Sequence, residues 1–338
     1  MATSSILITG GAGFIGCNLV RRVLATTDHN VVVLDALTYA GNLENLDGID
    51  RARLTFVHGD IIEATVVRSI IADHNVNGII HCAAESHVDR SITSAAPFIT
   101  TNVMGTLVLL EAAREHGLRF LQMSTDEVYG DIAADQPAVD ETAPIHTSSP
   151  YSASKASADL LVLSFVRTHG VNAVITRCTN NYGPYQFPEK FLPVMILNAL
   201  SSTPLPIYGD GKQIRDWIHV DDHCAAVMLV YERGRVGAVY NIGPDNERYN
   251  IDVARQILGI VGKDDSLLHH VTDRPGHDRR YAVDATLIRT ELGWRPEQDW
   301  NTALEQTIHW YAEHKGWCDR IKSGAYRQNT IESSSPSR

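Results

Sequence analysis

Short apolar runs alternate with segments of helical periodicity along the first half of the chain. The apolar runs lie at 5–9, 31–34, 54–57 and 78–81, and helical patterns separate them, as at 64–74. Runs of this length that are bounded by glycine or polar residues predict buried strands. Because buried strands that alternate with helices are typical of a doubly wound parallel sheet, we predict an α/β fold of the Rossmann type.

The pattern changes after residue 179. Before it, we predict helices at 98–116 and 151–169 and strands at 120–123 and 171–177; after it, Pro184, Pro188, Pro193, Pro204 and Pro206 indicate irregular, loop-rich structure. A helix at 221–231 and a strand at 238–242 are expected to return to the first domain. We therefore predict a larger domain, which spans 1–179 and 217–246, and a smaller α/β domain, which spans 180–216 and 247–327. The Ser-rich segment 328–338 is expected to be disordered.

Composition limits the classes of partner. With 338 residues, 44% of them hydrophobic, the chain can bury a large core. The 29 basic and 40 acidic residues give a net charge of −11, which disfavours nucleic acid and acidic membranes. The five cysteines are scattered, so we expect a reducing compartment and no metal. We see no leader and no window near the ~20 apolar residues of a membrane helix, and we expect a cytoplasmic protein.

A glycine-rich turn indicates a dinucleotide site. Gly11-x-Gly13-x-x-Gly16 follows a strand and opens a helix, whose free N–H groups and dipole suit a pyrophosphate. Asp35 ends the second strand, 22 positions after Gly13, where an acid binds ribose hydroxyls and repels a 2′-phosphate. We therefore expect NAD rather than NADP. Asp60 and Ile61 either border the adenine or begin a helix.

A tyrosine and a lysine form the first part of a catalytic pattern. Tyr151 and Lys155 stand four residues apart on one helix face, so that the two side chains can meet. The lysine charge is expected to lower the tyrosine pKa toward the working pH. Thr125 joins them at the carboxyl end of a strand.

With these residues the chain resembles the extended short-chain dehydrogenase/reductase family over residues 5–320, and its segment 124–130 (STDEVYG) resembles the nucleoside-diphosphate-sugar 4,6-dehydratases of that family. The resemblance implies dTDP-glucose as substrate and a 4-keto-6-deoxy sugar as product. It assigns proton removal from the C4 hydroxyl to Tyr151, the elimination base to Glu127, the elimination acid to Asp126 and a hydrogen bond to the C4 oxygen to Thr125. Two carboxyls with separated pKa values suit such an elimination.

The resemblance also implies binding residues. On the cofactor side they are Gly10, Gly13, Phe14, Ile15, Gly16, Asp35, Leu37, Thr38, Asp60, Ile61, Ala83, Ala84, Ser86, Thr101, Tyr151, Lys155 and Asn181. On the substrate side they are His87, Thr125, Asn180, Lys190, Phe191, Pro206, Ile207, Tyr208, Arg215, Asn250, Arg274 and His277. The basic segment 273–280 is interpreted as a phosphate site, with a surface ion-pair loop as the alternative.

Three questions stay open at this point. A sugar-nucleotide 4-epimerase or a non-catalytic NAD-binding protein could share the scaffold, and Asp126 and Glu127 could form a solvated acidic turn. One methyl group separates thymidine from uridine, so the choice between these bases is not fixed.

Family resemblance implies a homodimer that pairs through the helices near 98–116 and 151–169. Cys17 and Cys82 stand at positions that look atypical of the family.

Overall fold

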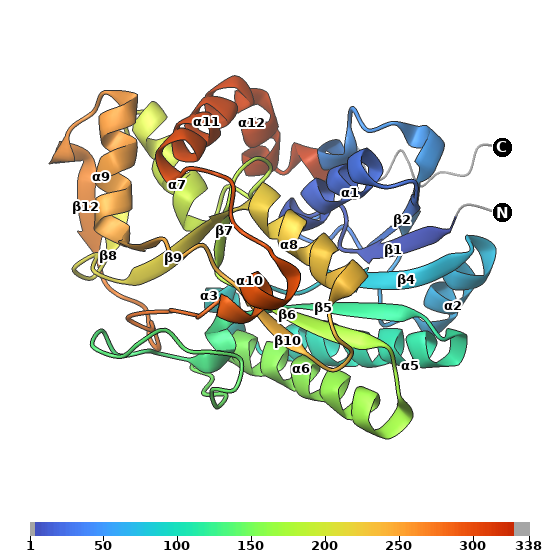
Figure 1. Ribbon diagram of the computed structural model, residues 1–338. Coiled ribbons are helices and arrows are strands. Elements are labelled where there is room, and N and C mark those ends of the chain that lie inside the picture. Colours follow the sequence, from blue (N-terminus) through green and yellow to red (C-terminus); the bar gives the residue numbers. More distant parts are fainter. Residues whose placement is uncertain (1–3, 328–338) are drawn as a thin grey trace.

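A seven-stranded parallel sheet forms the larger part of the molecule (Figure 1). The computed structural model describes residues 4–327. The strands lie in the order β10-β6-β5-β4-β1-β2-β3, and every neighbouring pair is parallel. Their bounds are β1 (Ser5–Thr9), β2 (Asn30–Asp35), β3 (Leu54–His58), β4 (Val76–His81), β5 (Arg119–Thr125), β6 (Ala173–Cys178) and β10 (Val239–Ile242). The predicted Rossmann-type sheet is confirmed.

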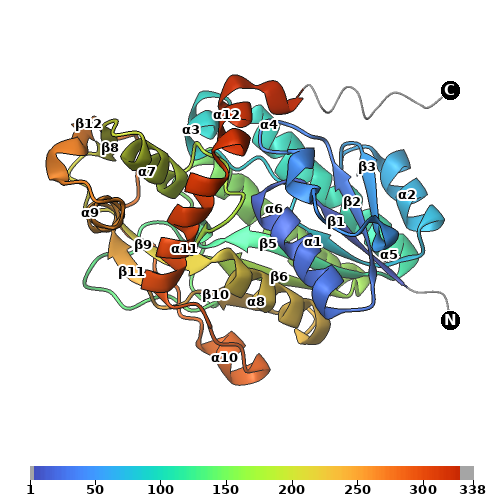
Figure 2. The ribbon, with the colours of Figure 1, turned by 90° about the horizontal axis from the view of Figure 1, so that it is seen from above.

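Helices cover both faces of this sheet, as Figures 1 and 2 show from two directions. One face carries α1 (Phe14–Thr26) and α8 (Val220–Arg233), and the other carries α2 (Ala64–Asp73), α5 (Thr106–His116) and α6 (Pro150–His169). Each helix layer buries its own apolar cluster against the strands, so the strands are enclosed on both sides. Shorter helices are α3 (Val88–Thr93), α4 (Ala96–Phe98), α10 (Thr286–Leu292) and the 3₁₀ turns Leu43–Leu46, Arg51–Arg53, Asp126–Tyr129, Asp265–Leu267 and Ala325–Arg327.

The helix predicted at 98–116 contains a π-helical segment, Ile99–Gly105, between α4 and α5. Taken together, Ala96–His116 is long and apolar enough by composition to cross a membrane, which corrects the expectation that no window approaches this limit. Nearly half of its most apolar window, 44%, is buried inside the fold, where it packs against α6. A buried core helix of a soluble protein meets the same criterion, so the segment is weak evidence for a membrane.

A smaller domain stands at one end of the large sheet and has its own core. It contains a three-stranded sheet, a two-stranded parallel sheet and four helices. The strands are β7 (Asn180–Tyr182), β8 (Leu205–Tyr208), β9 (Ile214–His219), β11 (Glu247–Tyr249) and β12 (Leu268–Val271); the helices are α7 (Phe191–Leu200), α9 (Asn250–Val261), α11 (Trp300–Glu313) and α12 (Lys315–Ser323).

The proline-rich stretch is more regular than the sequence indicated. Pro193 lies in the first turn of α7, where the backbone N–H groups have no partner inside the helix, so a proline there removes no hydrogen bond. The predicted boundaries assign Ile288 and Trp294 to the smaller domain, but both side chains are buried in the core of the large sheet. The predicted disordered tail, 328–338, lies outside the described residues.

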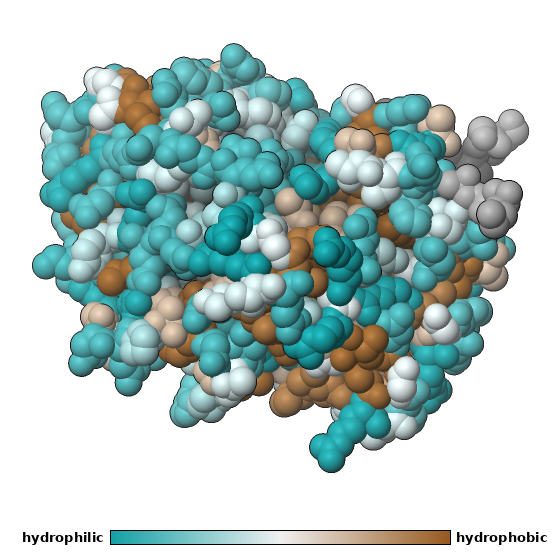
Figure 3. All heavy atoms as spheres, viewed as in Figure 1, coloured by the Kyte–Doolittle hydropathy of each residue, from teal (hydrophilic) through white to brown (hydrophobic). Residues whose placement is uncertain are grey.

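The surface and the cysteines add two observations. Figure 3 shows that the face over α8 and α11 is mainly hydrophilic, with apolar side chains gathered toward its lower part. All five cysteines are free thiols; Cys17 is fully buried and donates to the Phe14 carbonyl at 3.2 Å, so this position packs without disturbing the glycine turn. Among residues 4–327, no group of three His, Cys, Asp or Glu side chains could hold a metal ion.

Candidate active site

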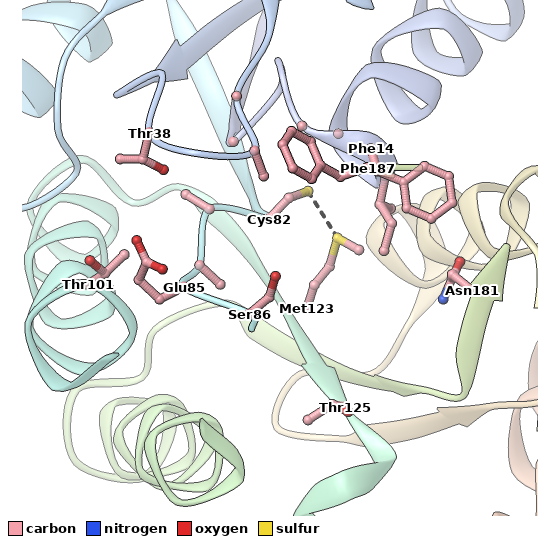
Figure 4. A pocket seen from close by; sticks show the side chains of 18 of the residues that line it. Phe14, Thr38, Cys82, Glu85, Ser86, Thr101, Met123, Thr125, Asn181 and Phe187 are labelled. Carbon is pink, nitrogen blue, oxygen red and sulfur yellow. Dashed lines mark hydrogen bonds between the residues drawn. The ribbon is translucent and has the colours of Figure 1, made fainter. Parts of the chain in front are cut away.

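One cavity of about 330 Å³ opens at the carboxyl ends of β1, β2, β4, β5 and β6 and extends toward the smaller domain (Figure 4). This edge is where open parallel sheets bind ligands, since the strand order reverses between β1 and β4. The structure brings most of the predicted residues to its wall. They are Gly10, Gly13, Phe14, Ile15, Gly16, Asp35, Thr38, Asp60, Ile61, Ala83, Ala84, Ser86, Thr101, Thr125, Asp126, Glu127, Tyr151, Lys155, Asn180, Asn181 and Lys190.

The glycine turn leaves the start of α1 open to an anion. Gly13 is the N-cap, and within residues 4–327 no side chain caps the helix or adds negative charge to its first turn. A side chain at Gly16 would place its Cβ 2.1 Å from the Gly10 carbonyl, and Gly10 itself has a φ of +69°. Only glycine fits at both positions, so the N–H groups of the first turn remain accessible to a diphosphate.

Asp35 supports the same turn. Its carboxylate accepts hydrogen bonds from the backbone N–H groups of Ala12, at 2.9 Å, and Leu37, at 2.8 Å. Leu37 adopts a φ of +50° and does not line the cavity. A carboxylate has about four acceptor sites, so Asp35 keeps acceptors for ribose hydroxyls while it fixes the loop. Asp60 accepts from the Ile62 N–H and lies before α2, so its side chain both caps a turn and borders the cavity.

The acid pair is withdrawn from the surface, with Asp126 buried and Glu127 half-buried. Asp126 and Glu127 begin the 3₁₀ turn after β5, and the Thr125 hydroxyl accepts from the Glu127 N–H at 3.3 Å. Burial, with the neighbouring Glu127 charge, raises the pKa of Asp126 well above its usual range. Burial also raises the pKa of Glu127, while the charges of Arg215, Arg274 and Lys190 oppose that rise. Asp126 is buried and Glu127 is half-buried, so the turn is not a fully solvated one, and the two carboxyls stand in different electrostatic surroundings.

The Tyr151–Lys155 pair differs from the prediction in one respect. Both side chains line the cavity, but the Lys155 ammonium donates to the Met123 carbonyl at 2.6 Å. The pKa of Tyr151 is raised well above its ordinary value, first by burial and then by the charge of Glu127, while a hydrogen bond with Thr125 opposes this. The expected lowering of the tyrosine pKa was wrong for the free chain, because burial and then the Glu127 charge raise that pKa, while the Lys155 ammonium donates to a carbonyl.

The loop after β4 forms another wall of the cavity. Ala83, Ala84 and Ser86 lie there, and Figure 4 shows Ser86 and Thr101 with the side chains around them. Lys190 reaches this loop from the smaller domain and donates to the Ser86 carbonyl at 3.0 Å. His87 is the N-cap of α3, outside the cavity wall, with its Nε2 3.7 Å from a Glu189 oxygen.

The smaller domain supplies polar atoms that lack partners. Asn180 and Asn181 line the cavity, and each has a buried side-chain oxygen without a hydrogen-bond partner among the described residues. Asn250 has a similar unpartnered oxygen at the start of α9, although it does not line the cavity. Unpartnered buried acceptors are costly, so these atoms are suited to a bound ligand.

Other predicted substrate residues lie away from the cavity wall. Phe191 stacks on Trp217, the ring centroids being 5.8 Å apart, and Ile207 is buried in the core of the smaller domain. Pro206 pairs with β12, and the Tyr208 ring contacts His277 edge to face. Their predicted contacts with a nucleoside base remain predictions.

The basic loop 273–280 forms mainly internal ion pairs. Arg274 contacts Asp89 at 2.9 Å, and His277 contacts Asp273 at 2.6 Å. The final two arginines of the loop are paired with Asp210 and Glu247. Arg215 is different: within the described residues, no carboxylate forms an ion pair with its buried guanidinium, which donates to carbonyls and lies over the Tyr281 ring. The loop thus forms ion pairs, and the predicted phosphate contacts of Arg215, Arg274 and His277, none of which lines the cavity, remain predictions.

Comparisons with known proteins agree with this geometry. Residues 7–307 match the family model described as GDP-mannose 4,6 dehydratase. The dTDP-glucose 4,6-dehydratase of Shigella flexneri is 49% identical, over 97% of this chain and 98% of that protein. The solved dTDP-glucose 4,6-dehydratase DesIV of Streptomyces venezuelae, with NAD and TYD bound, is 46% identical, covers 94% of this chain and 99% of its own, and superposes with a TM-score of 0.91. The chain belongs to the dTDP-glucose 4,6-dehydratase family.

The fold alone does not separate this dehydratase family from epimerases. The UDP-glucose 4-epimerase of Thermotoga maritima, solved with UDP-glucose, has a TM-score of 0.86 but is 30% identical, over 92% of this chain and 99% of its own. The higher identity to the 4,6-dehydratases therefore distinguishes the two.

Sequence reasoning missed several wall residues of this dehydratase-family site. They include Tyr39, Cys82, Met123, Gln186, Phe187 and Glu189. Figure 4 shows the Cys82 and Met123 sulfur atoms pointing toward each other, 3.0 Å apart. Phe187 and Glu189 lie within the segment 180–191 that resembles the family, and this was a usable signal. Tyr39 reaches the cavity through loop geometry that no local pattern indicates.

Proposed function

We propose that this chain removes water from dTDP-glucose and yields dTDP-4-keto-6-deoxyglucose, with NAD as a bound cofactor. The observation that supports this most is the convergence of Asp126 and Glu127 with Tyr151 and Lys155 on one cavity wall. A 4-epimerase needs the tyrosine and the lysine, but it has no step for two neighbouring carboxyls, one buried and one half-buried, with raised pKa values. A non-catalytic protein needs neither pair.

The cavity fits the cofactor. The open start of α1 suits a pyrophosphate, Asp35 has acceptors for the ribose, and the Asn181 oxygen has no partner in the described part of the chain. A bound NAD⁺ would supply the hydride-transfer chemistry that the reaction needs at C4 and C6 of the sugar.

The side chains of this protein carry the proton transfers. Tyr151 takes the C4 hydroxyl proton, and the Thr125 hydroxyl forms a hydrogen bond with the same oxygen. The resulting 4-keto group acidifies C5–H, and Glu127 removes that proton, so that the C6–O bond breaks. Asp126, whose raised pKa keeps its proton available, protonates the departing hydroxyl as water. Return of a proton to C5, together with the hydride at C6, completes a net loss of one water molecule.

An isotope experiment tests the reaction. With deuterium at C4 of dTDP-glucose, the label is expected at C6 of a 4-keto product. If the label returned to C4 with inverted configuration, the chain would be an epimerase. Assays with dTDP-glucose and UDP-glucose side by side test the base, for which we propose thymidine.

We further propose a cytoplasmic homodimer. The apolar side chains of Ile99, Met104 and Leu160 are 46%, 49% and 56% exposed on the π-helical segment and α6, in the two regions that family resemblance assigns to pairing. A sedimentation mass of two chains is expected, and Leu160→Asp should shift it toward one. A wild-type mass of one chain would reject the dimer.

A further inference from the structure

A buried polar network lies beneath the catalytic residues and connects the two elements that carry them. Its members are Asp159 on α6, Arg177 on β6, Tyr129 at the end of the 3₁₀ turn and Asn241 on β10. All four are at most 4% exposed. Figure 1 shows α6 running beside β5, β6 and β10.

The first half of the network is a buried ion pair. Arg177 donates from Nε to an Asp159 oxygen at 2.9 Å. Asp159 follows Lys155 by one helical turn, as Lys155 follows Tyr151, so the three side chains share a face of α6. Burial lowers the pKa of Lys155, and the Asp159 charge is the main effect that opposes this lowering.

The second half reaches the acid-bearing turn. The Tyr129 hydroxyl accepts from Arg177 at 2.9 Å and donates to the Asn241 side-chain oxygen at 2.8 Å. The Asn241 amide donates to the carbonyls of Val139 and Asp284, which fixes which end of the amide faces Tyr129. Tyr129 closes the turn that begins with Asp126 and Glu127.

The position of Arg177 makes the link short. In the sheet, Arg177 lies opposite Ser124 on β5 and opposite Asn241 on β10. Its planar guanidinium can hold a carboxylate on one edge and a phenol on the other, which a lysine ammonium does with less directional control. A buried pair of this kind contributes little net stability, so its geometric role carries more weight than its energy.

We propose that Tyr129, Arg177 and Asp159 are positioning residues that hold the Asp126–Glu127 turn in register with the Tyr151–Lys155 helix face. This inference rests on the proposed dehydration, in which the same sugar must meet Tyr151 at C4 and the two carboxyls at C5 and C6. A shift of about 1 Å between reacting groups can reduce a rate about 100-fold. The network therefore affects the elimination step more than the oxidation step, since only the turn that bears the carboxyls loses its anchor when Tyr129 is altered.

The test compares two tyrosine variants in the holoenzyme. Tyr129→Phe removes the hydroxyl from the network and keeps the ring. Tyr240→Phe is the matched control, because the buried Tyr240 hydroxyl also accepts one hydrogen bond, from the Arg235 N–H, and donates one, to Glu291, but does so away from the network. Single-turnover absorbance of the reduced nicotinamide reports oxidation, and loss of deuterium from C5 of labelled dTDP-glucose reports elimination.

We expect Tyr129→Phe to slow elimination about tenfold more than oxidation, so that the reduced nicotinamide accumulates, whereas Tyr240→Phe leaves the ratio of the two rates unchanged. Arg177→Lys, as a second variant, should shift the ratio in the same direction. If folded Tyr129→Phe left the ratio of the elimination and oxidation rates unchanged, the positioning role would be overturned, although the wild-type protein would still be a dehydratase. Failure of the wild-type protein to release C5 deuterium would instead reject the proposed function.

Discussion

The Lys155 ammonium donates a hydrogen bond to the Met123 main-chain carbonyl, at 2.6 Å. This bond ties α6 to β5 just before the catalytic turn. It also directs the lysine charge at the strand, and Tyr151, beside Glu127 in a buried site, keeps its proton in the free chain because its pKa is raised.

The first prediction concerns the pH dependence of sugar oxidation. Proton removal from the C4 hydroxyl needs the Tyr151 phenolate, and a raised pKa makes that form scarce at neutral pH. The single-turnover oxidation rate should therefore rise with pH across the neutral and alkaline range. Tyr151→Phe should lower it at least about 100-fold while circular dichroism remains unchanged. Tyr249→Phe, at a 44% exposed position, is the control and should keep the wild-type profile. A flat wild-type profile would contradict the assignment.

The second prediction separates elimination from oxidation. Glu127→Gln keeps the shape of the side chain but removes the base, so C5 deuterium release should fall about 100-fold or more. Oxidation at C4 should persist, because Tyr151 and Lys155 are intact. Glu305→Gln, an exposed change on α11, serves as the control. Unchanged turnover in Glu127→Gln would show that another group removes the C5 proton.

The third prediction concerns stability. Asp126 has a raised pKa in the folded chain, so the native state binds this proton more tightly than the unfolded state does. Its contribution is therefore fully present below the unfolded value, 3.8, and is lost as pH rises through the raised folded value. Asp126→Asn lacks this loss and should melt about 2–4 °C higher than wild type at neutral pH, although its elimination activity falls.

The melting difference should shrink as pH approaches 4. Asp135→Asn, at an exposed site, should show no such pH-dependent difference. Equal melting temperatures of wild type and Asp126→Asn at all pH values would indicate that the burial of Asp126 carries no such penalty.

The fourth prediction concerns the cofactor loop. Asp35→Asn replaces one acceptor oxygen with a donor, so either the Ala12 or the Leu37 N–H loses its partner. Leaving a buried donor unpaired costs about 1–3 kcal/mol, so NAD binding should weaken by about tenfold or more. The variant should also reject NADP less strongly, because the repelling charge is gone. Calorimetric titration of both cofactors measures this; a larger loss for NADP than for NAD would contradict it.

Much of the fold could be predicted because the signals are local. Buried runs such as 31–34 have too little polarity for any position other than an inner strand, and Gly16 has no room for a side chain. The helix beginning near Tyr151 was also correctly predicted, and the structure adds its Ser149 capping box.

The remainder depends on contacts between distant residues. The π-helical segment at 99–105 has no local sequence signature, and the loop that carries Tyr39 to the site contains Leu37 with a positive φ. The tyrosine pKa could not be judged from the Tyr-x-x-x-Lys spacing, since spacing does not show that Lys155 bonds the Met123 carbonyl. Substrate residues such as Ile207 were transferred by resemblance, and burial in a core cannot be deduced from a motif.

The order of the strands has a consequence for synthesis on the ribosome. β6 pairs with β5 on one side and with β10 on the other, but residues 179–238 must be made before β10 emerges. The nascent chain therefore holds an apolar strand with one free edge while it produces β7, β8 and β9. Such an edge is a template for pairing with other chains. Chains that end before residue 242 should therefore need chaperones most. A chain that ends anywhere between residues 179 and 238 lacks β10, so its large sheet is incomplete.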